Sequence, residues 1–555
     1  MNRFCVCILF FSMGFSAVFS QATVGLITHD SGSTDGYVLF APNGSDTTYL
    51  IDKCGYRVHN WASTHQPGQS VYFLEDGSLL RTGRITNPVF NAGGQGGIIE
   101  RIDWGGNILW SYLISSATQC QHHDIHYLPN GNVLAIVNEW ITSEQAALAG
   151  RNPAVFGTAL WSEKILEIQP VGLNEGNVVW EWHAWDHLVQ NFDSSKENFG
   201  IVNEHPELIN VNYSVGMQSD WLHCNSIDYN EVLDQIMLSS HNLNEFWIID
   251  HSTTTMESSE HLGGAHGRGG DLLYRWGNPE AYGRGNGVSK KLFGQHNVQW
   301  IDEAFPDGGN IILFNNGFQR PQGNYSSIDI LEPPLDGNGA YTIETGLSFL
   351  PADAYWTYTA PVPTDFYGMN ISGVQRLSNG NTLVCNGPSG DFFEINANDE
   401  IVWEYISPVG MGGSIISQGS TPGQNAVFRC TQYSPDYEGF DRTTLTSGAP
   451  IEINPLPSEC DIFTSIEHNT WCDGNTLRLF LKSKNELVIF SNSSLAKMNI
   501  VLLESTGRII QASKDVDFVA NESTILHLPN DLASGIYLLY VGDLKHQSIV
   551  KFIHP

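Results

Sequence analysis

The sequence predicts an all-β protein, with a β-propeller of about six blades followed by a small β-sandwich. Three observations support this fold class. Short apolar strands joined by Asn-Gly or Asp-Gly turns recur from about residue 36 to 437, as in VYFLEDGSLLRTG (71–83) and IHYLPNGNVLAIVN (125–138). A further strand that closes with Trp follows most of these hairpins, as in RIDWGGNILWSY (101–112). After about Pro455 the composition changes and Trp nearly vanishes.

The hairpin repeat is the main sign of a propeller. Asn-Gly and Asp-Gly suit hairpins because a tight two-residue turn needs positive φ at its centre. The strand-turn-strand half recurs at 71–83, 125–138, 227–240, 298–317 and 374–387, and the closing half at 50–61, 101–112, 167–182, 248–276, 327–344 and 393–405. Propeller blades bury their faces only against one another, which requires such repetition. A meander sandwich is the alternative, but the closing Trp recurs too regularly for it.

Two half-units lie at the ends of the repeat region. GYVLFAP (36–42) and YLID (49–52) have no inner strand before them, and NAVFRCTQY (425–433) has no outer strand after it. If these halves pair, the ring closes at about six blades and hides its own edges. We therefore divide the chain into a signal peptide, a propeller, a linker and a β-sandwich, at residues 1–20, 21–450, 451–473 and 474–555.

The first residues resemble a secretory signal, because Asn2 and Arg3 precede the apolar run Phe4 to Phe19. That run is too short to favour a membrane-spanning helix, and no later stretch is long and apolar enough to be one. We expect an exported protein.

The net charge limits the class of partner. Lys and Arg number 26 against 59 Asp and Glu, a formal charge of −33. This charge argues against nucleic acid and anionic membrane surfaces as partners, so a bound anion must be met by local histidines, arginines and backbone donors. Seven cysteines remain after the signal, without a CxxC pair typical of zinc sites, and their odd number leaves at least one outside any internal disulfide.

Two insertions interrupt the repeats, His183 to Asp220 and Ser252 to Leu272. The segment WDHLVQNF (185–192) in the first predicts a short helix. Long ordered loops on a rigid scaffold often form binding surfaces, so we expect both insertions to wall a pocket.

The histidines recur in register with the repeats. Two residues before the first apolar position of each inner strand stand Gln69, His123, Asn225, His296 and Ser372. Equivalent positions of a propeller meet at one end of the central channel, so His123 and His296 should approach each other. His223 lies two residues before Asn225 and should point to the same end. Three imidazoles there could bind a metal, hold an oxyanion or act as a nucleophile.

The cluster HHDIH (122–126) also suggests a metal site. Strand alternation, however, puts His122, Asp124 and His126 on one face and His123 on the other. No carboxylate falls in the register set, and zinc sites commonly have one in the second shell. We therefore expect no metal and favour His123 over His122 at the channel end.

Four segments occur in a specific order: HHDIHYLPNGN, DWLHCNSIDYN, IMLSSHNLNEFWIID, and LFGQHNVQWI followed by NIILFNNG. As an ordered set they resemble the arylsulfate sulfotransferase family, six-bladed propellers of exported bacterial proteins, over about residues 36–440. The resemblance implies ping-pong transfer of a sulfuryl group from a phenolic sulfate ester to another phenol, with no nucleotide sulfate donor, cofactor or metal. His296 matches the nucleophile, and His123 and His223 match the partners that hold the sulfate oxygens and stabilise the leaving phenolate.

The fourth catalytic position departs from the family, because His241 stands where the resemblance implies the arginine of an SSR motif. Histidine is mostly neutral near pH 7, whereas arginine keeps its charge and its fork of donors. We therefore expect weaker or pH-dependent oxyanion stabilisation, or a contribution from Arg275. We also expect Asn225 and His122 to contact the substrate.

The run NELVIFSN…GRII…LASGIYLLYV…VKFI resembles the sorting domains of the type IX secretion system of Bacteroidetes, although it lacks the Asn-Pro signature often found near the start of such domains. This resemblance implies export across the outer membrane by that machinery, to the cell surface or the medium, and no catalytic part for the module.

Two other functions remain open. A surface propeller could keep the histidines and bind sulfated or phenolic ligands without transfer. A metal-dependent or quinone-dependent oxidoreductase could share the fold, but the sequence has no Asp/Glu cluster for the calcium of such a cofactor.

Overall fold

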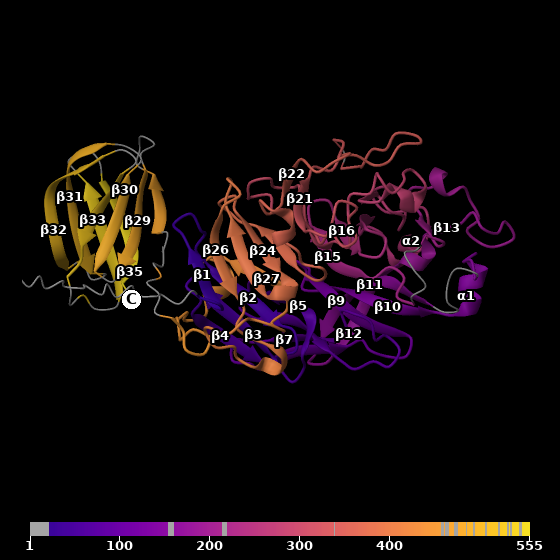
Figure 1. Ribbon diagram of the computed structural model, residues 1–555, viewed down its shortest axis with the longest axis horizontal. Coiled ribbons are helices and arrows are strands. Elements are labelled where there is room, and N and C mark those ends of the chain that lie inside the picture. The colour runs from indigo at the N-terminus through magenta and orange to yellow at the C-terminus, as the bar shows by residue number, and fades with distance from the viewer. Residues whose placement is uncertain are drawn as a thin grey trace, which may run out of the picture.

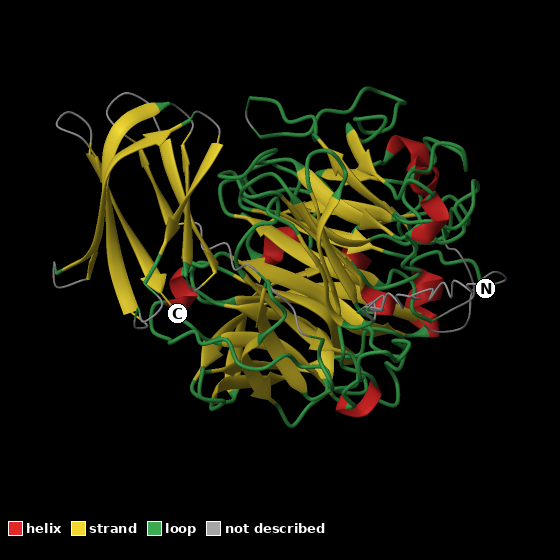
Figure 2. Ribbon diagram, turned by 60° about the vertical axis from the view of Figure 1, so that its left-hand side comes forward, coloured by secondary structure: helices red, strands yellow, loops and turns green. Residues whose placement is uncertain are grey.

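The computed structural model describes residues 22–555 except 154–159, 214–218, 338, 457–459, 461–465, 471–475, 484, 492–493, 505–507, 520–521, 530–531, 533–534, 543–546 and 555. The expected signal peptide, residues 1–20, lies outside the described residues. The chain forms a large ring of sheets and a smaller pair of sheets beside it (Figure 1). Strands dominate both parts and the helices are short (Figure 2). In the described part, no helix has the length and apolar character needed to cross a bilayer.

Five blades follow one another along the chain, each built from four consecutive antiparallel strands, the first of which lies innermost. The second blade comprises β5 (Pro67–Phe73), β6 (Leu79–Arg84), β7 (Gly97–Ile102) and β8 (Ile108–Leu113). The third comprises β9 (Gln119–Tyr127), β10 (Val133–Ile141), β11 (Leu160–Val171) and β12 (Glu175–His183). The fourth comprises β15 (Cys224–Asn230), β16 (Gln235–Ser240), β17 (Glu245–Asp250) and β18 (Tyr274–Trp276). The fifth comprises β19 (His296–Trp300), β20 (Ile311–Asn315), β21 (Ser327–Leu331) and β22 (Trp356–Tyr358). The sixth comprises β23 (Gly373–Arg376), β24 (Thr382–Asn386), β25 (Asp391–Ile395) and β26 (Ile401–Ile406).

The first blade joins the two ends of the repeat region. It comprises β27 (Val427–Tyr433), β2 (Tyr37–Pro42), β3 (Thr47–Asp52) and β4 (Arg57–Ala62). The inner strand β27 pairs with β2, which brings Tyr433 opposite Tyr37. The predicted joining of the two half-units and the six-bladed ring are therefore confirmed. The sequence did not predict β1 (Gly25–His29), which adds a fifth strand to the outer edge of the sixth blade by pairing with β26.

The closing tryptophans hold neighbouring blades together, which explains why the repeats contain them. Each indole Nε1–H donates a hydrogen bond to a backbone carbonyl of the next blade, in the pairs Trp61 with Asp103, Trp110 with Glu175, Trp182 with Gly270, Trp276 with Pro351 and Trp403 with Lys53. The last pair crosses the ring closure, from the sixth blade to the first. A large buried ring with one satisfied polar atom thus fixes five of the six blades to the next one.

The C-terminal module has two four-stranded sheets. One contains β28 (Ile466–Thr470), β29 (Thr476–Ser483), β30 (Glu486–Ser491) and β33 (Glu522–His527), and the other contains β32 (Ile509–Phe518), β31 (Leu495–Glu504), β34 (Gly535–Gly542) and β35 (Gln547–His554). Residues of both sheets share one apolar core, for example Leu487 and Leu502, which makes the module a sandwich. β28 lies within residues 451–473, expected to be linker, so the sandwich takes in residues before 474.

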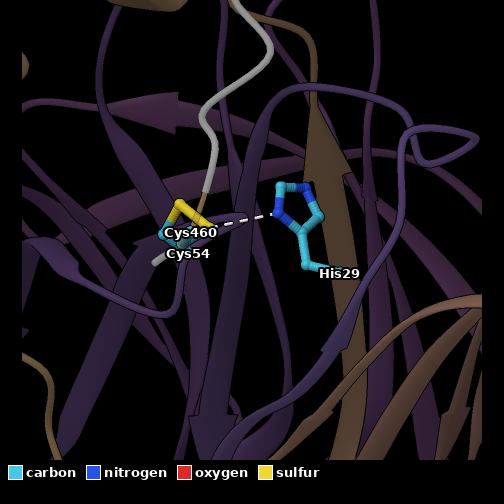
Figure 3. Close-up of side chains that lie close together, drawn as sticks. All are labelled: His29, Cys54 and Cys460. Carbon is cyan, nitrogen blue, oxygen red and sulfur yellow. Dashed lines mark hydrogen bonds between the residues drawn. A yellow bond between two sulfur atoms is a disulfide. The ribbon is translucent and has the colours of Figure 1, made fainter. Parts of the chain in front are cut away.

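A disulfide ties the segment after the propeller back to the first blade. Cys54, in the turn between β3 and β4, is bonded to Cys460, 406 residues later in the chain. Figure 3 shows the ring of His29 beside this bond, with Nδ1 3.1 Å from Sγ of Cys460. The free cysteines among the described residues are all buried, namely Cys120, Cys224, Cys385 and Cys430. Cys472 lies outside the described residues.

Short elements fill the loops. They are α1 (Ser143–Leu148), α2 (Thr255–Ser258) and the 3-10 turns η1 (Ala184–Asp186), η2 (Val202–Glu204), η3 (Pro279–Tyr282), η4 (Pro363–Asp365), η5 (Gly387–Ser389), η6 (Met411–Gly413) and η7 (Glu438–Phe440). The helix predicted over 185–192 is wrong, because only the turn η1 forms there. The following apolar pair instead forms strand β13 (Leu188–Val189), which pairs in parallel with β14 (Ile209–Asn210) of the same insertion.

Candidate active site

Four imidazoles meet at one end of the propeller channel. Ring centroids lie 4.7 Å apart for His123 and His223, 5.2 Å for His223 and His241, and 5.4 Å for His241 and His296. The histidine cluster, as we name these four residues, comes from the third, fourth and fifth blades. The structure thus brings His123, His223 and His296 together and adds His241 between the last two.

Local breaks in the inner strands place these side chains. His123 has φ +50°, and the pairing of β9 with β10 shifts register around it. His296 begins β19, where Asn297 has φ +49° and the pairing with β20 also shifts register. A bulge of this kind leaves a residue unpaired and turns its side chain away from the regular pleat. The strand starts therefore aim the rings at one another.

The same bulge corrects the expected separation of His122 from His123. Alternation would put them on opposite faces, yet their Nδ1 atoms lie 2.8 Å apart. The reason is the positive φ of His123, which breaks the period of two. His122 therefore lies behind His123, with its Nε2 2.7 Å from Oε2 of Glu163.

Asp220 is a further residue of the site, and the register did not reveal it. Its Oδ2 lies 2.5 Å from Nδ1 of His223. Burial lowers the pKa of His223, but the charge and hydrogen bond of Asp220 outweigh this effect and raise that pKa above 6.5. Among the four rings of the cluster, His223 is thus the one favoured as an imidazolium. The segment DWLH contained the only signal, an acid three residues before the histidine.

Asn316 fixes the tautomer of His296. The Asn316 Nδ2 group donates to the carbonyls of Gly368 and Ile371, so its Oδ1 is left to accept from Nδ1–H of His296. The carbonyl of Gly294 also accepts from this Nδ1. Nε2 therefore has the lone pair, and no described residue is hydrogen-bonded to it. Burial, and then His241, hold the pKa of His296 well below 6.5, so the ring is neutral at pH 7.

His123 is fixed through a chain of hydrogen bonds. The Glu163 carboxylate accepts from Nε2–H of His122, which leaves Nδ1 of His122 to accept from Nδ1–H of His123. Nε2 of His123 therefore also has a lone pair. Burial and the neighbouring histidines, first His223, hold the pKa of His123 well below 6.5.

His241 does not supply the charge of an arginine. Its Nδ1 lies 2.9 Å from Oδ1 of Asn242, whose amide group donates to the carbonyl of Asp220. Burial and the charge of His223 lower the pKa of His241 to about 4. The ring is neutral at pH 7, with its lone pair on Nε2.

The structure does not bring Arg275 to the cluster. Its guanidinium forms a fully buried ion pair with Glu245 and donates to the carbonyls of Pro206 and Leu208. Arg275 thus fixes the first insertion to the fourth blade, and its expected part in oxyanion binding has no geometric support. Asn225 is also fully buried, and its amide donates to the carbonyl of Gln295.

A cavity of about 620 Å³ opens onto the cluster. It is lined by Asn91, Ala92, Gly93, Trp161, Ser219, Asp220, His223, His241, Asn242, Asn244, Lys290, Gly294, Phe318 and Gln319. The first insertion contributes Ser219 and Asp220, whereas the second contributes none of the lining residues, so only one of the two expected walls is found. His296 is 2% exposed and adjoins the lining residues His241 and Gly294, so a ligand reaches it past them.

The arrangement offers three neutral imidazoles, each with a lone pair on Nε2, and one imidazolium donor. Such a set can attack an electrophile and protonate a leaving group within one site. Three imidazole nitrogens could also hold a metal ion, so the expected absence of metal stays a prediction.

The chain resembles known proteins at the levels of family and of solved structure. No curated protein matches it. Solved structures that resemble it include a protein of unknown function from Bacteroides caccae (13% identity, 72% of this chain and 99% of that chain, TM-score 0.38) and a virginiamycin B lyase from Staphylococcus aureus in complex with quinupristin (10%, 70% and 90%, 0.32). A periplasmic gluconolactonase from Pseudomonas aeruginosa covers 89% of this chain and 100% of its own at 10% identity and a TM-score of 0.33. The arylsulfotransferase (ASST) family matches residues 26–409, from β1 through the sixth blade. The chain therefore belongs to the arylsulfotransferase (ASST) family.

Proposed function

We propose that the protein transfers a sulfuryl group from an aryl sulfate ester to a phenolic acceptor through a sulfohistidine at His296, without a nucleotide sulfate donor. The observation behind this proposal is the pairing of two protonation states in one cluster. His296 is held neutral with a lone pair on Nε2, and the carboxylate of Asp220 raises the pKa of His223 and so favours its protonated form. A nucleophile and an acid are thus both ready before the substrate binds.

In the first half-reaction, Nε2 of His296 attacks the sulfur of the ester. The bond from sulfur to the phenolic oxygen breaks as the N–S bond forms. The leaving oxygen takes the proton from Nε2 of His223, so a neutral phenol departs and His223 becomes neutral. The sulfuryl group stays on His296.

In the second half-reaction, an acceptor phenol gives its hydroxyl proton to Nε2 of His223. Its oxygen attacks the sulfur, the N–S bond breaks, and His296 regains its lone pair while His223 regains its charge. His123 lies beside His223, and its Nε2 lone pair suits it to orient the acceptor hydroxyl. This assignment differs from the sulfate-holding role that the family resemblance implies for His123.

The local charge supports an anionic substrate in an acidic protein. The chain has a formal charge of −33, which repels a sulfate ester at long range. At the cavity, Lys290 and His223, whose protonated form Asp220 favours, are among the lining residues. Donors placed where negative charge develops on the leaving oxygen stabilise the transition state.

The test is mass spectrometry of the full chain after incubation with 4-nitrophenyl sulfate without acceptor. One added sulfuryl group on the peptide that contains His296 is expected, with release of about one equivalent of nitrophenol. A His296→Ala variant should show neither. A His126→Ala variant is the control, because His126 lies on β9 but faces Asp228; it should keep both. Labelling that persists in His296→Ala would rule out the assigned nucleophile.

A non-catalytic ligand-binding propeller is the second candidate function. The neutral His241 favours it, because the site lacks the permanent charge that the family resemblance implies at this position. Saturable binding of 4-nitrophenyl sulfate with no covalent label and no release of nitrophenol would identify this function.

We also propose that the sandwich serves export through type IX secretion, which would place the propeller outside the outer membrane. In support, none of the lining residues of the cavity comes from the sandwich. Deletion of residues 466–555, which removes β28 with the rest of the sandwich, should retain the propeller in the periplasm of a Bacteroidetes host, and undiminished release would contradict this role.

A further inference from the structure

A second group of histidines lies near the outermost strands of the third and fourth blades. His187 belongs to the first insertion, and His261 and Asp271 belong to the second. Nδ1 of His187 and Nδ1 of His261 each lie 2.8 Å from the same atom, Oδ1 of Asp271. Two imidazoles thus converge on one carboxylate oxygen, and none of the three residues lines the cavity at the histidine cluster.

The proton count at His187 is the first indication of a ligand. Its Nε2 lies 2.8 Å from the carbonyl oxygen of Ser258, which can only accept, so Nε2 is protonated. In a neutral ring, Nδ1 then presents a lone pair to the carboxylate oxygen of Asp271, which presents another. Either a cation lies between these atoms or they share a proton.

The packing holds these groups rigidly. His187 is fully buried, and the ring of Trp182 stacks on it at 4° with centroids 5.6 Å apart. Gly270 packs so closely that a Cβ atom there would lie 2.6 Å from Nε2 of His187. By contrast, the side chain of His261 is 57% exposed, which leaves one side open for a metal ion to enter and for a water ligand.

We propose that His187, His261 and Asp271 bind one divalent transition-metal ion of the zinc type. Their ligand atoms all lie within 4.8 Å of one another. Two imidazole nitrogens and a carboxylate oxygen are ligands that Zn²⁺ accepts, with water in the fourth position. A ligating imidazole usually donates its other N–H to a backbone carbonyl or carboxylate, as Nε2 of His187 does to Ser258.

The site would join the two insertions, 183–220 and 252–272. The first insertion ends at Asp220, whose carboxylate contacts His223, so an ion at the other end of the insertion would stabilise the loop that contributes to the active site. Because this site shares no residue with the histidine cluster, the proposal stands independently of the sulfotransferase mechanism.

The test is calorimetric titration of ZnCl₂ into the full chain after treatment with a chelator. The wild type should bind Zn²⁺ and gain thermal stability with it. A His261→Ala variant, altered at an exposed position, should lose one binding site or bind at that site at least about 100-fold more weakly. His205→Ala is the matched control, because His205 is an exposed histidine that pairs with one carboxylate, Glu207, at 3.0 Å; its titration should equal that of the wild type.

Binding by the histidine cluster does not obscure the result. A Zn²⁺ ion held there would persist in His261→Ala, so the number of sites falls by one in either case. Equal stoichiometry and affinity in the wild type and His261→Ala would overturn the assignment. So would a wild type that binds no Zn²⁺, and a proton shared by His187 and Asp271 would then account for their contact.

Discussion

Oδ2 of Asp220 lies 2.5 Å from Nδ1 of His223, and this contact makes His223 the favoured site of positive charge among the four rings of the cluster. The carboxylate comes from the end of an insertion, whereas the histidine leads into the inner strand β15. Their pairing determines how the proposed reaction should depend on pH.

We expect a bell-shaped pH dependence of kcat/KM with limbs on either side of 6.5. His296 must be neutral to attack, and its pKa is held well below 6.5, so activity should fall only in more acidic solution. His223 must be protonated, and its pKa is raised above 6.5, so activity should fall again as the pH rises through that value. Steady-state kinetics with an aryl sulfate across the pH range measures both limbs. Two limbs that both lie below 6.5 would contradict the assigned charge of His223.

An Asp220→Asn variant should move the alkaline limb to lower pH. Without the carboxylate, burial lowers the pKa of His223 and only the weaker effect of Glu163 opposes it. The loss of a charged acid should reduce kcat/KM at pH 7 by about 10²- to 10⁴-fold, as expected for general acid catalysis. Asp193→Asn, in an exposed part of the same insertion, should leave the profile unchanged. An unshifted alkaline limb in Asp220→Asn would show that His223 does not titrate there.

An Asn316→Ala variant should lower kcat/KM by about 10- to 100-fold, because Nδ1 of His296 loses the nearer of its two acceptors and keeps only the carbonyl of Gly294 at 3.1 Å, so the ring is held less firmly in place. Asn315→Ala is the matched control. Asn315 is a buried neighbour whose amide donates to Lys291 and Asp329 but does not touch His296. Both variants should have a lower melting temperature than the wild type. Only Asn316→Ala should lose much more activity than its loss of stability explains.

A Gly94→Ala variant should displace His123. Gly94 has φ +74°, and a Cβ atom there would lie 1.9 Å from Cε1 of the His123 ring. A misplacement of about 1 Å in a reacting group costs about 100-fold in rate. Gly106→Ala controls for the backbone, since Gly106 has φ +87° and no neighbour within 4 Å of such an atom. We expect the two variants to have similar melting temperatures and only Gly94→Ala to lose activity. Equal activities would mean that the placement of His123 is not critical.

The approach of His123 and His296 could be predicted because repeated strands put equivalent residues at one end of a channel. Asp220 and Asn316 could not be found this way. Asp220 comes from an insertion that belongs to no repeat, and Asn316 follows a second strand, outside the register of first strands. Arg275 does not reach the cluster for a different reason. A buried guanidinium needs a carboxylate partner, and Glu245 of the adjacent strand provides it.

The expected separation of His122 from His123 failed for a local reason. Alternation assumes a regular strand. Positive φ is uncommon in a non-glycine residue such as His123, so the sequence HHDIH did not predict the bulge. The six blades, in contrast, were predictable, because hairpin turns and closing tryptophans satisfy requirements that every blade shares.

A His241→Arg variant should raise kcat/KM for an aryl sulfate by about 10-fold. The pKa of His241 is about 4, so at pH 7 the native ring offers no charge, whereas a guanidinium keeps its charge and donors at any accessible pH. His241→Ala is the control for space, because it enlarges the path past His241 without adding charge. Activation by alanine equal to that by arginine would show that the native ring acts as a steric gate and not through its missing charge.

The disulfide between Cys54 and Cys460 should stabilise the closed ring. It bridges 406 residues of sequence, and a cross-link across a long loop removes much conformational entropy from the unfolded chain, with losses of about 2–5 kcal/mol when such a bond is removed. Cys460→Ser and Cys54→Ser should each lower the melting temperature of the propeller by the same amount. The double variant should lower it no further, because either single change already breaks the bond. A reductant should lower the melting temperature of the wild type but leave that of Cys460→Ser where it is. If the reductant lowers both equally, the stabilising bond is not the one between these two residues.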